Sequence, residues 1–71
     1  MNQAAIGSYI AKKRREKNLT QEQLAETLGV SNKTISKWEN GTAMPDLKKL
    51  TDLATLFDVS MDELLGTKLT S

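Results

Sequence analysis

The segment from residue 32 to residue 41, NKTISKWENG, combines polar and apolar side chains at helical spacing. Ile35 and Trp38 lie three residues apart and mark the inward side of a short helix. The other side carries an amide, two lysines and a serine, namely Asn32, Lys33, Ser36 and Lys37. Asn can form two hydrogen bonds with adenine, Lys can donate to guanine, and Ser can bond to either base. The same side chains also suit a merely solvated face, and the segment by itself favours that simpler interpretation.

The size and composition of the chain exclude several classes of function. With 71 residues it forms at most one domain with one core. It contains no cysteine and no histidine, so disulfides, thiolate metal sites and catalytic imidazoles are ruled out. The sequence also has no glycine-rich phosphate loop. We therefore expect no enzyme, no cofactor, no metal and no small-molecule ligand.

The location of the protein is also constrained by its sequence. No stretch approaches the roughly 20 apolar residues of a membrane-spanning helix, so we expect no membrane contact. The N-terminus lacks the basic and then apolar pattern of a signal peptide. A cytoplasmic protein is the resulting expectation.

The net charge of +1 hides an uneven distribution along the chain. Residues 1–41 carry seven basic and four acidic side chains, whereas residues 42–71 carry three basic and five acidic ones. A basic first part and a mildly acidic second part are compatible with ordinary surface solvation. They indicate a binding surface only if the cations share one face.

Every segment of the chain favours helix, because no stretch alternates with a period of two. The first helix is expected over about residues 4–17, with Ile6, Tyr9 and Ile10 in the core. Phe57, in the fourth expected helix, is assigned to the core by the same spacing. Four more helices are expected to begin after N-caps, which are Thr20, Ser31, Asp46 and Ser60. Thr20 with Gln23, and Ser60 with Glu63, have the spacing of capping boxes. The predicted domain spans residues 1–66, and residues 67–71 are expected to be a frayed tail.

The second and third expected helices are joined by only Gly29, Val30 and Ser31, which suits a sharp crossing. The run TQEQLAETLGVSNKTISKWENG resembles the helix-turn-helix of the λ-repressor/Cro-like (XRE-type) DNA-binding domains. The resemblance covers residues 6–65 and includes a trailing pattern of Pro45, Leu47, Leu50, Leu53-Ala54, Phe57, Val59-Ser60, Asp62 and Leu64-Leu65. It implies an all-α, five-helix λ-repressor-like domain whose third helix, about residues 32–40, enters the major groove.

The resemblance also implies roles for individual side chains. The base-contacting candidates become Asn32, Lys33, Ser36 and Lys37. The start of the second helix offers free backbone N–H groups to an anion, and Gln21 matches a family residue that binds a phosphate. The phosphate candidates are Thr20, Gln21, Thr34, Asn40 and Thr42. Lys13 and Lys17 are better interpreted as solvated side chains.

Two charged residues are expected to pair inside the domain. Arg14 extends the row of Ile6 and Ile10, and Glu39 follows Trp38, so both point partly inward. An unpaired charge in such a place is costly. We therefore predict a structural Arg14–Glu39 ion pair, which the family has at corresponding positions. Its expected role is to orient the third helix rather than to add stability.

The expected function is sequence-specific binding of double-stranded DNA by a transcriptional regulator, with repression as the expected sign. A homodimer on a two-fold symmetric operator is the expected assembly, because one such domain contacts only half a site. Met61, Leu65 and Leu69 are candidates for an exposed apolar patch through which two copies would dimerise. The alternative is a protein-interaction module, such as a small antitoxin or anti-repressor, that uses the same fold.

Overall fold

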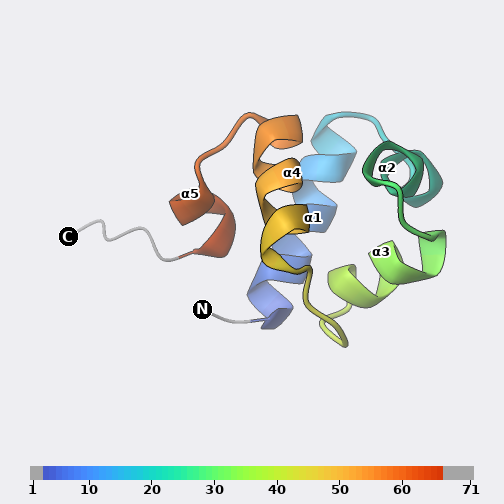
Figure 1. The fold of residues 1–71 in the computed structure, drawn as a ribbon, viewed down its shortest axis with the longest axis horizontal. Helices are drawn as coiled ribbons and strands as arrows, with labels where there is room; N and C mark the ends of the chain where they lie inside the picture. The colour runs from blue at the N-terminus through green and yellow to red at the C-terminus, as the bar shows by residue number, and fades with distance from the viewer. Residues whose placement is uncertain (1–2, 67–71) are drawn as a thin grey trace.

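The computed structural model describes residues 3–66, and this part of the chain contains five helices and no strand (Figure 1). Their bounds are α1 Gln3–Glu16, α2 Gln21–Leu28, α3 Asn32–Glu39, α4 Leu47–Phe57 and α5 Met61–Leu65. The all-α, five-helix prediction is thereby confirmed. The expected tail over residues 67–71 lies outside the described residues.

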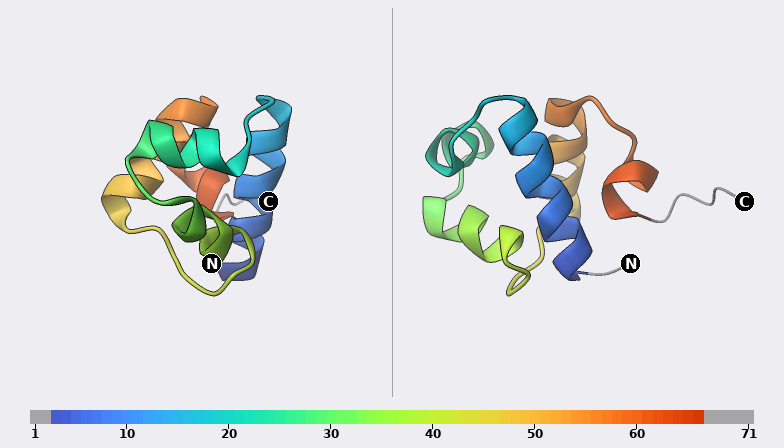
Figure 2. Two further views of the ribbon diagram at one scale, coloured as in Figure 1. Left: turned by 90° about the vertical axis from the view of Figure 1, so that its right-hand side faces the viewer. Right: turned by 180° about the vertical axis from the view of Figure 1, so that it is seen from behind.

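The arrangement of the helices separates two sides of the domain. In Figure 1, α1 and α4 occupy the centre, α2 and α3 lie to their right, and α5 lies to their left. There α2 is seen almost end-on while α3 runs across the view, so the two helices cross steeply. The side view in Figure 2 shows the reverse, with α2 across the view and α3 pointing toward the viewer. The short connection after Gly29 therefore produces the predicted sharp crossing.

The helix starts follow from side-chain caps. The four N-cap residues accept hydrogen bonds from backbone N–H groups three positions on, and they are Thr20, Ser31, Asp46 and Ser60. At Thr20 the capping box is complete, since its own N–H also donates to the Gln23 side chain. At Ser60 only the first half of the predicted box forms. The Glu63 carboxylate instead accepts a hydrogen bond from the Tyr9 hydroxyl at 3.2 Å.

One hydrophobic core joins all five helices. Its fully enclosed side chains are Ile6, Ile10, Leu24, Ile35, Leu53 and Leu64. Among residues 3–66, no polar or charged residue is fully buried. Phe57 is buried as predicted, whereas Tyr9 is only half-buried because its hydroxyl reaches Glu63 at the surface.

The expected apolar patch is not found where it was sought. Met61 and Leu65 are partly buried and pack against the core, and Leu69 lies outside the described residues. The exposed large hydrophobic side chains of the described part are Met44, at 37% exposure, and Leu47, at 72%. Met44 lies in the connection between α3 and α4, and Leu47 is the first residue of α4. None of the described helices has the length and hydropathy needed to span a membrane.

Candidate nucleic-acid interface

The helix α3 has an anchored side and an open side. Ile35 and Trp38 are 0% and 4% exposed, so they fix the helix against the core. On the opposite side Asn32, Lys33 and Lys37 are exposed, and Ser36 is half-buried. Positions 32, 33, 36 and 37 share one side of an α-helix, because residues four apart lie one above the other. The predicted base-contacting residues therefore lie together on one surface.

The two lysines of this surface are Lys33 and Lys37. Within residues 3–66, neither ammonium group takes part in an ion pair or hydrogen bond. Each can therefore donate to an external acceptor without first breaking an internal bond. Lys and Asn on an exposed helix face supply the donors and acceptors that base edges match.

A partly buried polar cluster lies beneath this helix, and it contains the predicted ion pair. The Arg14 Nε lies 2.6 Å from Glu39 Oε2, and Arg14 Nη2 donates to Glu39 Oε1 at 3.2 Å. Arg14 Nη1 donates to the Leu19 carbonyl at 2.8 Å. The two charged side chains are only 13% and 8% exposed. Two parallel N–H···O bonds fix relative orientation as well as distance, so α1 holds the end of α3 in place.

Gln21 joins the same cluster, which the sequence did not predict. Its Nε2 donates to Glu39 Oε1 at 2.9 Å, so α1, α2 and α3 meet at one carboxylate. A glutamine amide has two N–H donors, and the second remains for another acceptor. Gln21 is also the first residue of α2, where backbone N–H groups lack helical partners. Its assignment as a phosphate contact stays a prediction that this geometry permits.

The other phosphate candidates have local roles in helix ends. Thr20 caps α2, and Thr34 bonds to the α3 cap Ser31 through its backbone N–H and its hydroxyl. Asn40 ends α3, and its Oδ1 accepts the Thr42 N–H at 3.2 Å. The Thr42 hydroxyl donates to the Lys37 carbonyl at 3.2 Å. Thr20, Asn40 and Thr42 are nevertheless exposed, whereas Thr34 is half-buried.

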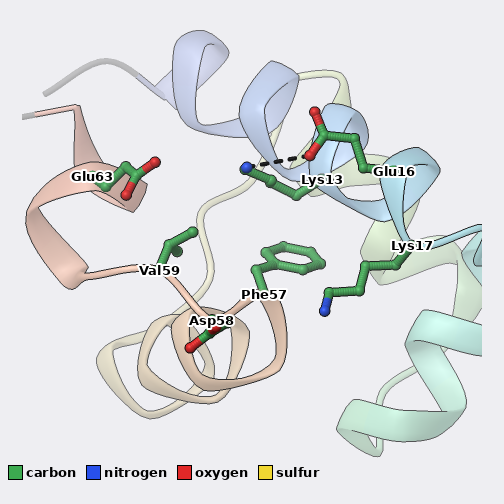
Figure 3. A pocket seen from close by; sticks show the side chains of 7 residues that line it. All are labelled: Lys13, Glu16, Lys17, Phe57, Asp58, Val59 and Glu63. Carbon is green, nitrogen blue, oxygen red and sulfur yellow. Dashed lines mark hydrogen bonds and ion pairs between the residues drawn. The ribbon is translucent and has the colours of Figure 1, made fainter.

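Two cations at and just after the end of α1, Lys13 and Lys17, lie away from this surface. Lys13 Nζ pairs with Glu16 at 3.2 Å and lies 5.6 Å from the centre of the Tyr9 ring. The bond to Glu16 raises the pKa of Lys13 above its ordinary value of 10.5, which opposes the smaller effect of burial. Figure 3 shows Lys13 and Lys17 beside a cleft between α1 and the α4–α5 connection. Lys13 is therefore half-buried and paired with Glu16, and not the freely solvated side chain that was expected.

That cleft has charged walls of both signs. It has a volume of about 430 Å³, and its lining residues are Lys13, Glu16, Lys17, Phe57, Asp58, Val59 and Glu63. Two cations face three carboxylates there, and one cation is already paired (Figure 3). Among residues 3–66, no three His, Cys, Asp or Glu side chains lie close enough together to hold a metal ion. The cleft thus lacks the single-sign charge of the α3 surface.

Two further contacts of the interface could not be predicted from local spacing. Lys49 of α4 donates from Nζ to the Leu28 carbonyl at 2.9 Å, which satisfies an otherwise open carbonyl at the end of α2. Gln3 of α1 donates from Nε2 to the Gly41 carbonyl at 2.8 Å, just after α3. Both residues act across the fold on helix ends, and no capping pattern in the sequence marks them.

Comparison with known proteins agrees with this architecture. Residues 10–64 match the helix-turn-helix family. The transcriptional activator BcrR of Enterococcus faecalis is 54% identical over 50 residues, which cover 70% of this chain and 24% of that protein. The CTXphi transcriptional repressor RstR of Vibrio cholerae is 35% identical over 61 residues, covering 86% and 54% respectively. The chain thus spans a quarter to about half of the length of these curated relatives.

Solved structures show the same fold. The P22 c2 repressor, in complex with a synthetic operator, superposes with a TM-score of 0.78 at 32% identity over 83% of this chain and 89% of that one. The biofilm regulator SinR, in complex with DNA, superposes with a TM-score of 0.76 at 33% identity over 84% and 97%. The family match, the relatives and the shared fold together show that this chain belongs to the XRE-type helix-turn-helix family.

Proposed function

We propose that this domain binds double-stranded DNA in a sequence-specific manner and regulates transcription, as a repressor, by placing α3 in the major groove. The observation that carries the proposal is the division of α3 into two sides. Ile35 and Trp38 fix the helix from within, while the unpaired Lys33 and Lys37 stand on its exposed side. Similar proteins include the P22 c2 repressor in complex with an operator, which supports the same docking mode.

Base contacts are assigned to Asn32, Lys33, Ser36 and Lys37. The three exposed members have free side chains, and a major groove about 12 Å wide admits an α-helix that carries them. Lys33 and Lys37 are one turn apart and would meet neighbouring base pairs. Ser36, which is half-buried between them, would contribute at closer range.

Backbone contacts are assigned to the residues around the start of α2 and the end of α3. The N-terminus of α2 presents Thr20 and Gln21 together with free N–H groups, which favour a phosphate. Asn40 and Thr42 would contact a second phosphate beyond the other end of α3, and Thr34 would assist from its first turn. Such contacts set the register of the domain on DNA and leave the choice of sequence to α3.

The proposed assembly is a homodimer on a two-fold symmetric operator. With eight residues, α3 is about 12 Å long and so spans about three to four base pairs. A second copy doubles the contacted sequence and places two such helices about one DNA turn apart. The proposal assigns this activity to the cytoplasm and includes no catalysis.

A protein-interaction module is the second candidate function. The exposed Leu47 and Met44 favour it, because large apolar side chains at a surface often mark contacts with another protein. An antitoxin or anti-repressor of this kind would use the α3–α4 connection and would not need free lysines on α3.

The proposal is tested by selection from a library of random DNA duplexes, with the binding repeated at two salt concentrations. We expect enrichment of a two-fold symmetric site and a fall in affinity as salt rises, since phosphate contacts release counterions. Weak, salt-sensitive binding without enrichment would reject sequence-specific recognition by this chain. The protein-interaction alternative is tested by comparing the proteins that the wild type and the Leu47→Asp variant retain in a pull-down. That alternative predicts that Leu47→Asp loses the partner.

A further inference from the structure

The backbone of α1 approaches the end of α3 closely at Gly7. This residue is buried in α1. A Cβ atom placed on it would lie 2.1 Å from the Trp38 carbonyl oxygen, 2.9 Å from the Glu39 carbonyl oxygen and 3.0 Å from the Glu39 carbonyl carbon. All three contacted atoms belong to the backbone at the end of α3, so no side-chain rotation can relieve the clash.

The Trp38 carbonyl also takes part in the hydrogen bonds at the C-terminal end of α3. The Trp38 oxygen accepts the Gly41 N–H at 3.2 Å, while the Asn40 N–H donates to the Ser36 carbonyl at 3.0 Å. Asn40 in turn accepts the Thr42 N–H through its side chain. A displacement of the Trp38 carbonyl would therefore pass directly to residues 40–42, which follow the proposed DNA-contacting helix.

The residues beside Gly7 contact the same segment. Gln3 donates to the Gly41 carbonyl at 2.8 Å. Gly41 has a φ of +81°, and a Cβ there would lie 3.3 Å from the Ala4 Cα. The first two turns of α1 thus contact the end of α3 and its following turn at three points, through Gln3, Ala4 and Gly7.

We propose that Gly7 is a positioning residue for DNA recognition: its missing side chain lets the α1 backbone act as a stop that sets how far Lys37, Asn40 and Thr42 project toward DNA. This inference rests on the proposed function. Real Cβ contacts are essentially never closer than 3.0 Å, so one added methyl group requires the α1 backbone and the Trp38 carbonyl to separate by about 0.9 Å or more. Binding constellations need their groups held within about 0.5 Å, so such a shift breaks contacts at the end of α3.

The test compares Gly7→Ala with Ser8→Ala, an exposed neighbour on the same helix. Alanine is ordinarily the better helix former, so a loss in Gly7→Ala reflects the contact and not the helix. In the proton–nitrogen correlation spectrum of free Gly7→Ala, we expect shifted amide signals for residues 38–43 and a shifted Arg14 Nε–H signal. On the duplex recovered by selection we expect about tenfold weaker binding, the loss of roughly one base contact, and a smaller loss on scrambled DNA, because Asn40 and Thr42 are assigned to phosphates. Ser8→Ala should match the wild type in every measurement.

A folded Gly7→Ala variant with wild-type signals at residues 38–43 and wild-type affinity would overturn the proposal. If Gly7→Ala does not fold, Gln3→Ala decides, because it removes only the bond to the Gly41 carbonyl. Shifted amide signals of Gly41 and Thr42 in Gln3→Ala, together with weaker binding to the selected duplex, would support the proposed role of α1. An unchanged spectrum and an unchanged affinity would reject it. If the wild type itself binds no DNA, the proposed function fails, and the spectra alone still decide whether α1 positions the end of α3.

Discussion

The two sides of this domain are held together by different kinds of contact. On the side of α2 and α3, three helices meet at the Glu39 carboxylate through Arg14 and Gln21. On the side of α4 and α5, the buried contacts are apolar, with Leu53 and Leu64 fully enclosed. Hydrogen bonds are directional, whereas apolar burial is not. The side that presents the proposed DNA-contacting helix is therefore the side on which orientation is fixed most closely.

The largest effect is expected from Leu53→Ala, which removes a fully enclosed side chain of α4. Truncation of such a leucine costs about 2–5 kcal/mol of unfolding free energy, which is a large part of what a small domain has. Urea unfolding measures the loss. If α4 does not orient α3, the folded Leu53→Ala protein should keep the wild-type ratio of affinities for the selected and the scrambled duplex. Reduced discrimination would show that α4 also orients α3.

The second effect concerns the buried ion pair. Arg14→Met leaves the Glu39 carboxylate largely buried with only Gln21 as a partner. We expect it to lower the free energy of unfolding by about 3 kcal/mol, which is less than the upper limit given for Leu53→Ala. The double variant Arg14→Met with Glu39→Met should regain much of that stability, because an apolar pair avoids the cost of burying charge. We expect it to remain poor at discriminating DNA sequences. A stable double variant with full discrimination would show that the pair does not orient α3.

A smaller effect is expected from Lys49→Met, which removes the bond from α4 to the Leu28 carbonyl. Lys49 is half-buried, so the loss should be about 1 kcal/mol in urea unfolding. Lys48→Met is the matched control, since Lys48 is exposed and its bond to Asp52 is long, at 3.5 Å. Equal losses in the two variants would mean that the contact across the two sides contributes nothing specific.

The smallest effect is a dependence on pH at Tyr9. Burial raises the pKa of Tyr9 above its ordinary value of 10.0, and the hydrogen bond to Glu63 raises it further. A raised folded-state pKa contributes stability that is complete below the unfolded pKa and is lost as pH rises through the folded one. Stability should thus fall above about pH 10 in the wild type and fall less in Tyr9→Phe. Parallel curves for the two proteins would exclude this contribution.

Local features of the molecule were predictable from its sequence, and distant ones were not. The caps at Thr20, Ser31 and Asp46 depend on residues three positions away, and all form. The Arg14–Glu39 pair was predictable because each residue extends an inward stripe of its helix. The bond from Gln21 to Glu39 requires the crossing distance of α2 and α3, which no spacing along the chain contains.

The predictions that failed share a cause. Tyr9 follows the core spacing of α1, but its hydroxyl is drawn to Glu63 of α5 at the surface. The same bond leaves the second capping box half-formed. Met61 and Leu65 were sought as an exposed patch, yet α5 turns both against the core and Leu47 is exposed instead. In each case the packing of α5 on the rest of the domain decided the outcome, and that packing is not local.

The central claim is that the exposed side of α3 recognises DNA sequence, and Lys37→Ala tests it most directly. Lys12→Ala is the control, because Lys12 is an exposed cation of α1 outside the proposed interface. Binding should be measured on the selected duplex, on its single-base variants and on scrambled DNA at several salt concentrations. We predict that Lys37→Ala loses about 1–3 kcal/mol at one base position while Lys12→Ala resembles the wild type. Equal weakening on every duplex, with a salt slope reduced by about one, would assign Lys37 to a phosphate and contradict the claim.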